Sequence, residues 1–304
     1  WHMLPQVRVP RQVTREGLSD GALLISWGLF KKMYIADNLA EIVTSVFEGP
    51  GPLDGLSALM AVYAFAFQIY CDFSGYTDVA RGLGRILGFN LFANFHLPYF
   101  ALNPTEFWRR WHISLSAWLR DYLYIPLGGN RGGTARTHVN LMITMLLGGL
   151  WHGAAWTFVL WGGYHGALLV VHRLCRPVLD VMFAARTGIA EAVSRGVRVL
   201  ATFHLVCFGW LIFRADSLAE AGGILSAIGN GVSWTPRGSY YLSRLVLLVA
   251  FLLIVQLVQA WRDDLLVLQQ VRSPWARASL YLYMYCSIWF LGNLGGHEFI
   301  YFQF

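Results

Sequence analysis

The chain has 304 residues, of which 56% are hydrophobic and only 13% charged, and its mean hydropathy is +0.48. A soluble domain usually carries about 25% charged residues, so this composition excludes an ordinary soluble domain and a disordered chain and predicts a membrane protein. The formal net charge of +6 indicates basic loops beside membrane spans rather than a nucleic-acid partner. The four cysteines lie far apart without a CxxC pair, which predicts neither a disulfide framework nor a zinc site.

The first 20 residues are polar and lack the pattern of a signal peptide, and we expect a chain truncated at its amino end. Residues 21–46 are apolar but interrupted by Lys31, Lys32, Asp37 and Glu41. They predict either a short span followed by a turn or a helix lying in the membrane interface.

Intervals free of charged residues predict the membrane spans, since about 20 apolar residues cross a bilayer as a helix. These intervals are residues 55–71, 137–172, 199–213, 245–261 and 278–297. The interval 137–172 exceeds one crossing, so it must hold two helices or a broken hairpin. With no strand-like alternation, the predicted fold class is an all-α, polytopic membrane protein, a helical bundle forming one domain over residues 1–304.

Residues 72–136 combine charges and prolines with many aromatic side chains. The aromatic and apolar residues recur at three- and four-residue steps, which predicts one helical face made of Trp108, Trp111, Leu115, Trp118 and Tyr122. Arg109, Arg110 and Arg120 fall mostly away from that face, so the segment reads as one amphipathic helix at the interface or in a cavity. The glycines of residues 128–133 predict a turn and not a phosphate-binding loop.

His152 lies in the middle of the longest uncharged interval, between glycines. Ionisable residues inside membranes are rare and usually functional, and an imidazole can take a proton near neutral pH. From position alone, His152 is either a catalytic base or a residue that bonds a neighbouring helix. His112, beside the aromatic face, could reach the same cavity, although in isolation it reads as an interfacial polar residue. His165 would not share a helical face with His152.

Other chemistries find less support in the spacing. No HxxxH or HExxH pattern exists, so we expect no metal site. A Ser-His-Asp triad could be drawn from Ser74, His152 and either Asp72 or Asp121, but no GxSxG elbow supports it. The sequence favours Asp72 or Ser74 as a helix cap at the end of a span.

Four segments together resemble the membrane-bound O-acyltransferases, in their bacterial alginate O-acetylation branch: residues 67–78, 107–124, 126–133 and 148–156. Residues 295–304 also look like the carboxyl terminus of that branch. The resemblance implies a central tunnel and a multi-pass location in the bacterial inner membrane. Family members are longer, so it also implies that upstream helices are missing here.

The same resemblance implies the chemistry. His152 matches the family's catalytic histidine, and His112 matches its upstream partner position. Acetyl-CoA would be the acyl donor, with no bound cofactor, and the expected partners are membrane lipid, an exported polysaccharide such as alginate, and a periplasmic acetyltransferase. Weaker candidates for lining the tunnel or the donor entrance are Trp151, Arg110, Asp121 and Asn130, which could equally be packing residues, caps and interface anchors.

Two alternatives to an acyltransferase stay open on the sequence. A non-enzymatic conduit or scaffold would hold a pore or dock a periplasmic acetyltransferase that completes the transfer. A proton-coupled transporter would use its histidines as relays, but the sequence shows no inverted repeats.

Overall fold

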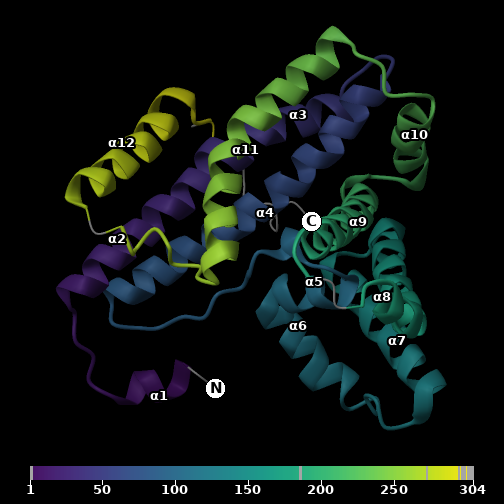
Figure 1. Cartoon of the computed structure of the whole chain (residues 1–304), viewed down its shortest axis with the longest axis horizontal. Helices are drawn as coiled ribbons and strands as arrows, with labels where there is room; N and C mark the ends of the chain where they lie inside the picture. The colour runs from purple at the N-terminus through teal and green to yellow at the C-terminus, as the bar shows by residue number, and fades with distance from the viewer. Residues whose placement is uncertain (1–2, 185–186, 272, 294, 296–298, 300–304) are drawn as a thin grey trace. The chain divides into compact units, whose positions relative to one another are not determined.

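The computed structural model describes residues 3–184, 187–271, 273–293, 295 and 299 (Figure 1). Every regular element in these residues is helical, which confirms the predicted all-α fold class. Contacts divide the described part of the chain into two compact units, one made of the described residues of 3–93 and 227–299 and the other of those of 94–226. That residues 1–304 form a single domain stays a prediction. Most of the segment 295–304, including His297, lies outside the described residues.

The first unit is built around one long helix that packs against a second helical segment. Its elements are α1 (Met3–Arg8), α2 (Arg15–Leu29), the π-helix η1 (Phe30–Ala36), α3 (Asp37–Phe47), α4 (Gly55–Ile86), α11 (Pro236–Arg262) and α12 (Pro274–Leu291). α2, η1 and α3 follow one another without a break and pack along α4, as Figure 1 shows. The interpretation as a short span followed by a turn was therefore wrong, because this segment is the buried middle of a continuous helical run. That it lies in the membrane interface stays a prediction.

Side-chain caps set the beginnings of these helices. Thr14 accepts a hydrogen bond from the backbone N–H of Gly17 at the start of α2, and Asp54 accepts one from Ser57 at the start of α4. Such caps satisfy amide groups that have no partner within the first helical turn. They explain why the helices begin where charged or polar residues interrupt the apolar runs.

Glycines bring α2 and α4 into close contact. A Cβ atom on Gly28 would lie 2.5 Å from the carbonyl oxygen of Gly75, and one on Gly21 would lie 2.6 Å from that of Gly82. Small residues at such crossings let helix backbones approach closely, as is common in membrane helices. The crossing positions the charged residues of α4 against η1.

A buried network of charges links η1 to the middle of α4. The Lys31 ammonium group, 3% exposed, lies 2.8 Å from Asp78 and donates to the Ser74 hydroxyl at 2.8 Å, while Lys32 pairs with Asp72 at 2.7 Å. The prediction that Asp72 or Ser74 caps a helix was wrong, because α4 continues to Ile86. The lysines interrupting residues 21–46 therefore neutralise carboxylates on α4.

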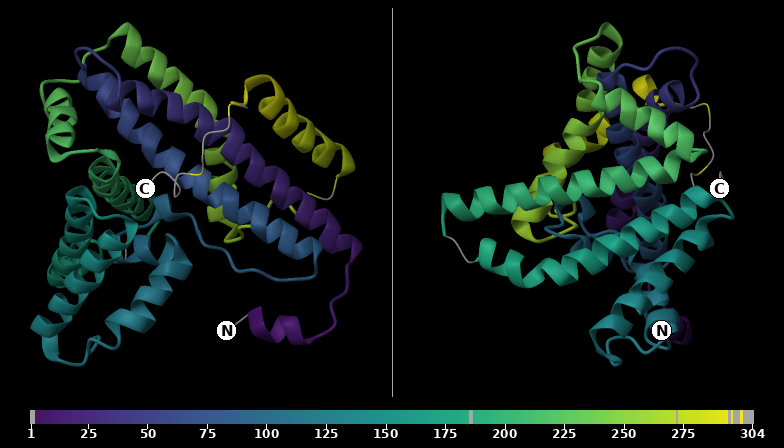
Figure 2. Two further views of the ribbon diagram at one scale, coloured as in Figure 1. Left: turned by 180° about the vertical axis from the view of Figure 1, so that it is seen from behind. Right: turned by 90° about the vertical axis from the view of Figure 1, so that its right-hand side faces the viewer.

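The second unit contains the 3-10 turn η2 (Pro98–Phe100), α5 (Pro104–Arg110), α6 (Ile113–Leu119), the π-helical turn η3 (Arg120–Tyr124), α7 (Gly133–His152), α8 (Trp156–Met182), α9 (Ile189–Arg214) and the start of α10 (Leu218–Gly229). α8 packs against both α7 and α9, and the right-hand view of Figure 2 shows α8 and α9 running side by side. The break between α7 and α8 confirms the two helices expected in residues 137–172.

Three of the described helices are long and apolar enough to cross a membrane: α4, α9 and α11. They contain the predicted intervals 55–71, 199–213 and 245–261. The central tunnel stays a prediction, and the cavity described below lies within the second unit.

The predicted amphipathic helix of residues 108–122 is broken into α5, α6 and η3. Its aromatic residues do not share one environment, since Trp111 is 2% exposed whereas Trp118 is 52% and Tyr122 is 62% exposed. The break falls at His112, whose φ of 41° is left-handed and cannot continue a right-handed helix. The single-face interpretation was wrong for this reason.

Candidate active site

The hairpin of α7 and α8 places His152 at a helix end. His152 is the last residue of α7, and the extended backbone of Gly153 follows it (φ 166°, ψ 160°). Further along the hairpin, a Cβ atom on Gly149 would lie 2.2 Å from the carbonyl oxygen of Phe158, and one on Gly162 would lie 2.3 Å from that of Met145. These glycines let the two backbones touch, which brings the first turns of α8 against the end of α7.

Aromatic rings surround the His152 imidazole. Its centroid lies 5.2 Å from that of Trp161 and 5.1 Å from that of Phe213, both in edge-to-face arrangements. The adjacent Trp151 ring lies 5.0 Å away. Edge-to-face contacts of this kind fix the plane of a ring, so the imidazole is held in a defined orientation.

His112 occupies the break between α5 and α6. The segment before α5 braces this break, because the Ile113 N–H donates to the Asn94 carbonyl at 3.0 Å and the His96 N–H donates to the Arg110 carbonyl at 2.9 Å. Left-handed backbone at a residue other than glycine costs about 1–3 kcal/mol and is concentrated at functional sites. The contacts around His112 therefore hold it in an otherwise unfavourable conformation.

The two histidines are brought together around Trp151. The ring centroids of His112 and Trp151 lie 6.4 Å apart, and Trp151 also contacts His152. Burial, and to a lesser extent His152, lower the pKa of His112 to about 3. A neutral imidazole offers one donor and one acceptor nitrogen, so His112 is suited to orienting a hydroxyl.

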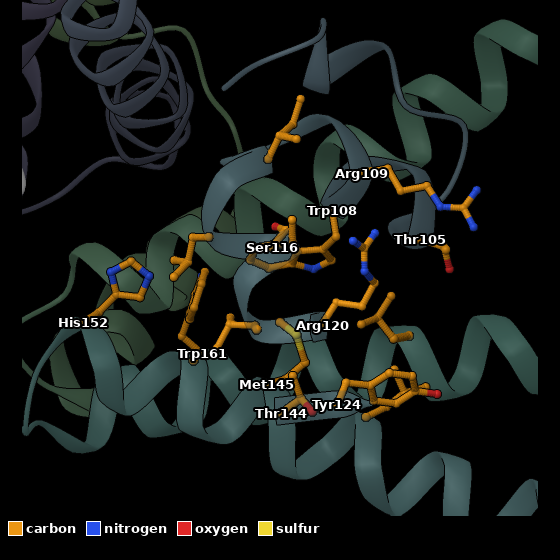
Figure 3. Close-up of a pocket in the computed structure, with 17 residues that line it drawn as sticks. Thr105, Trp108, Arg109, Ser116, Arg120, Tyr124, Thr144, Met145, His152 and Trp161 are labelled. Carbon is orange, nitrogen blue, oxygen red and sulfur yellow. The ribbon is translucent and has the colours of Figure 1, made fainter. Parts of the chain in front are cut away.

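A cavity of about 400 Å³ opens beside His152. Its wall is contributed by α5, α6, η3, α7 and α8, and its polar or aromatic lining residues include Trp108, Arg109, Ser116, Arg120, His152 and Trp161. Figure 3 shows His152 at one end, Trp161 and Trp108 along the middle, and Arg109 with Thr105 toward the other end. The mostly apolar wall with a few convergent polar groups is typical of a small-molecule site.

The weaker sequence candidates lie around this cavity and do not line it. Arg110 pairs with Glu106, and Asp121 forms an exposed pair with Arg120 at 2.7 Å. The Asn130 side-chain oxygen accepts a hydrogen bond from the Tyr124 hydroxyl at 2.6 Å. Trp151 is 54% exposed. Their predicted functional roles stay predictions.

Sequence reasoning missed two features of the site: the place of Trp161 in the cavity wall and the contact of His165 with Trp161. The comparison of His165 with His152 assumed an uninterrupted helix, whereas the chain reverses at residues 153–155. Trp161 contacts both imidazoles, with centroid distances of 5.2 Å to His152 and 5.0 Å to His165. The signal available in the sequence was the pair of glycines directly after Trp161, which predicts a close helix contact at that point.

Among the described residues, no three His, Cys, Asp or Glu side chains gather in a way that could hold a metal ion. The ionisable groups bordering the cavity are His152, Arg109 and Arg120, with Tyr124. What this arrangement offers chemically is a proton acceptor at one end of an apolar cavity.

Comparison with known proteins points to one family. The sequence model of the MBOAT, membrane-bound O-acyltransferase family, matches residues 14–211. The chain is 46% identical over 225 residues to "Probable alginate O-acetylase AlgI" of Azotobacter vinelandii, an alignment covering 74% of this chain and 43% of that protein. It is 40% identical over 235 residues to "Peptidoglycan O-acetyltransferase" of Helicobacter pylori, covering 76% of this chain and 43% of that protein.

The name of a third, less similar relative contains a different acyl group, D-alanyl. The chain is 31% identical over 168 residues to "Teichoic acid D-alanyltransferase" of Bacillus subtilis, covering 52% of this chain and 41% of that protein. The chain thus spans about two-fifths of the length of these relatives.

Proposed function

Because the chain belongs to the membrane-bound O-acyltransferase family, we propose that the protein transfers an acetyl group from a cytoplasmic thioester donor, acetyl-CoA, toward a hydroxyl of an exported polysaccharide such as alginate. The observation that carries this proposal is the position of His152, an oriented imidazole at the end of an apolar cavity. Two of the relatives are named as an alginate O-acetylase and a peptidoglycan O-acetyltransferase. These names support a polysaccharide as the final acceptor.

In this proposal His152 acts as the general base. Its imidazole takes the proton of the acceptor hydroxyl as the oxygen attacks the thioester carbonyl carbon, and it returns that proton to the sulfur when the carbon–sulfur bond breaks. A positioned base is typically worth about 10²–10⁴-fold in rate. The apolar wall contributes by keeping water away from the activated donor.

His112 orients the acceptor hydroxyl. Its ring and that of His152 both lie beside Trp151, and burial keeps the pKa of His112 low, so it is neutral when the hydroxyl binds. The protein works in the bacterial inner membrane, with a periplasmic acetyltransferase as the partner that passes the group to the polysaccharide.

The test replaces His152 in the protein expressed from its complete natural gene, in membranes supplied with labelled acetyl-CoA and the polysaccharide system. His152→Ala is expected to abolish acetylation at matched expression. The matched control is His204→Ala, which removes an exposed imidazole on α9 that bonds the Leu200 carbonyl and does not line the cavity. Acetylation that persists in the His152 variant would overturn the enzymatic mechanism and favour a conduit or docking scaffold.

A further inference from the structure

The cavity beside His152 carries permanent positive charge at one end only. Among the described residues that line it, Arg109 and Arg120 are the permanently charged side chains, and no aspartate or glutamate belongs to this wall. Both arginines lie on the side of Trp108 away from His152 (Figure 3). A cleft with apolar walls and charges of one sign attracts oppositely charged ligands. This end of the cavity therefore favours an anion.

The two guanidinium groups are accessible to a ligand. Arg109 is exposed and forms no ion pair or hydrogen bond within the part of the chain that the structure describes. Arg120, also exposed, donates to the Asp121 carboxylate from its Nε atom at 2.7 Å and from Nη2 at 3.1 Å. Its Nη1 atom has no acceptor among the described residues. Since a pair as exposed as this one contributes little free energy, both cations can bind an anion.

The position of the arginines matches the shape of a thioester donor. A molecule such as acetyl-CoA carries its negative charges on phosphate groups, at the opposite end of a narrow arm from the thioester. The cavity of about 400 Å³ falls within the range of small-molecule sites, and its arginine end is open because both side chains are exposed. A thioester placed at His152 therefore leaves the charged part of the donor at the arginines.

We infer that Arg109 and Arg120 bind a phosphate group of the acyl donor and so align its thioester with His152. This inference rests on the proposed function and names the part of the donor that the protein recognises. Guanidinium groups suit this role because their N–H groups match phosphate oxygens in bidentate geometry. A lipid phosphate offers the same chemistry to an arginine at a membrane surface, so the experiment has to separate these two sources of phosphate.

The experiment measures acetyl transfer by the protein expressed from its complete natural gene with two donors. These are acetyl-CoA and S-acetyl-pantetheine, which has the same thioester arm but no phosphate. In the wild type, the KM for S-acetyl-pantetheine is expected to be at least about tenfold higher, since a hydrogen bond to a charged group is worth about that factor in affinity. Arg109→Gln is expected to raise the KM for acetyl-CoA about tenfold and to leave kcat, and both constants for S-acetyl-pantetheine, near the wild-type values.

The matched control is Arg195→Gln, which removes an exposed arginine of α9 that does not line the cavity. It is expected to leave the KM for both donors unchanged. An equal rise in KM for both donors in Arg109→Gln would mean that Arg109 acts through the fold. An unchanged KM for acetyl-CoA would assign Arg109 to a lipid phosphate, and either result would overturn the inference.

The wild type also tests the inference without any substitution, which covers the case of a variant that does not fold. Equal KM values for the two donors in the wild type would overturn phosphate recognition while the proposed function stands. Transfer from neither donor would overturn the proposed function together with this inference. Arg120→Gln is expected to show the same dependence on the donor phosphate as Arg109→Gln.

Discussion

The close contact of α7 and α8 predicts opposite effects for alanine at two adjacent glycines. At Gly162 a Cβ atom would lie 2.3 Å from the Met145 carbonyl oxygen and 3.1 Å from the Cα atom of Leu146, whereas at Gly163 it would meet only the Cδ2 atom of Leu146 at 3.5 Å. Since carbon–oxygen contacts between helices are about 3.3–3.6 Å, Gly162→Ala forces the backbones apart by about 1 Å.

The expected energies follow from these distances. Alanine gains about 0.5–1 kcal/mol over glycine inside a helix, and both variants share that gain. Overpacking costs typically about 1–3 kcal/mol, and only Gly162→Ala incurs it. We therefore expect Gly162→Ala to be less stable than Gly163→Ala by about 1–3 kcal/mol, and Gly163→Ala to be at least as stable as the wild type.

Thermal unfolding in detergent, followed by tryptophan fluorescence, measures this difference. One kcal/mol shifts Tm by about 2–4 °C for chains of 150–250 residues, so the two variants are expected to differ by several degrees. Equal Tm values would refute the inference that the hairpin depends on backbone contact at Gly162.

Two further predictions concern charged groups of the first unit. Lys31→Met leaves Asp78 with a single cationic partner, Arg81, and is expected to destabilise the protein by about 3 kcal/mol, as for a broken buried pair. The control Arg176→Met breaks an exposed pair and is expected to change stability by less than about 1 kcal/mol. Denaturation in detergent compares the two variants, and equal losses of stability would contradict the burial argument. Burial alone would raise the pKa of Asp54, but hydrogen bonds from Ser57 outweigh it and lower the pKa below 3.8. The ionised cap therefore contributes stability above pH 3.8 that is lost as pH falls through the lowered pKa, so the advantage of wild type over Asp54→Asn in Tm is expected to shrink with acidification, and a constant difference would contradict it.

The composition and the charge-free intervals were sufficient to predict helices and their approximate places. An interval without charged side chains can be buried as a helix along its whole length, so the charge-free intervals mark where long helices can form. The 137–172 interval was too long for one crossing, and the chain breaks there after His152. The positive φ angles of Gly128 and Gly129 likewise confirm the turn predicted for residues 128–133.

The sequence pattern did not predict which side chains far apart in the chain pair with one another. Asp72 and Ser74 read as caps because polar side chains near the end of an apolar run usually serve that role. Their actual partners, Lys32 and Lys31, lie about 40 residues earlier on another helix. No local pattern distinguishes a buried carboxylate with a distant lysine from one at a helix end.

The site itself lies where helical periodicity fails, and this explains why it was only partly predicted. His112 sits at a left-handed break and His152 at a helix end, so neither can be placed by counting 3.6 residues per turn. A regular helix satisfies its own backbone and presents side chains in fixed rows, whereas a break lets two residues on different segments face one space. The contact of Trp161 with His152 exists only because the chain reverses between α7 and α8, whereas its contact with His165 follows from the four-residue spacing along α8. Residue types therefore indicate which histidine could act as a catalytic group, and the helix breaks at His112 and after His152 determine which side chains lie next to it.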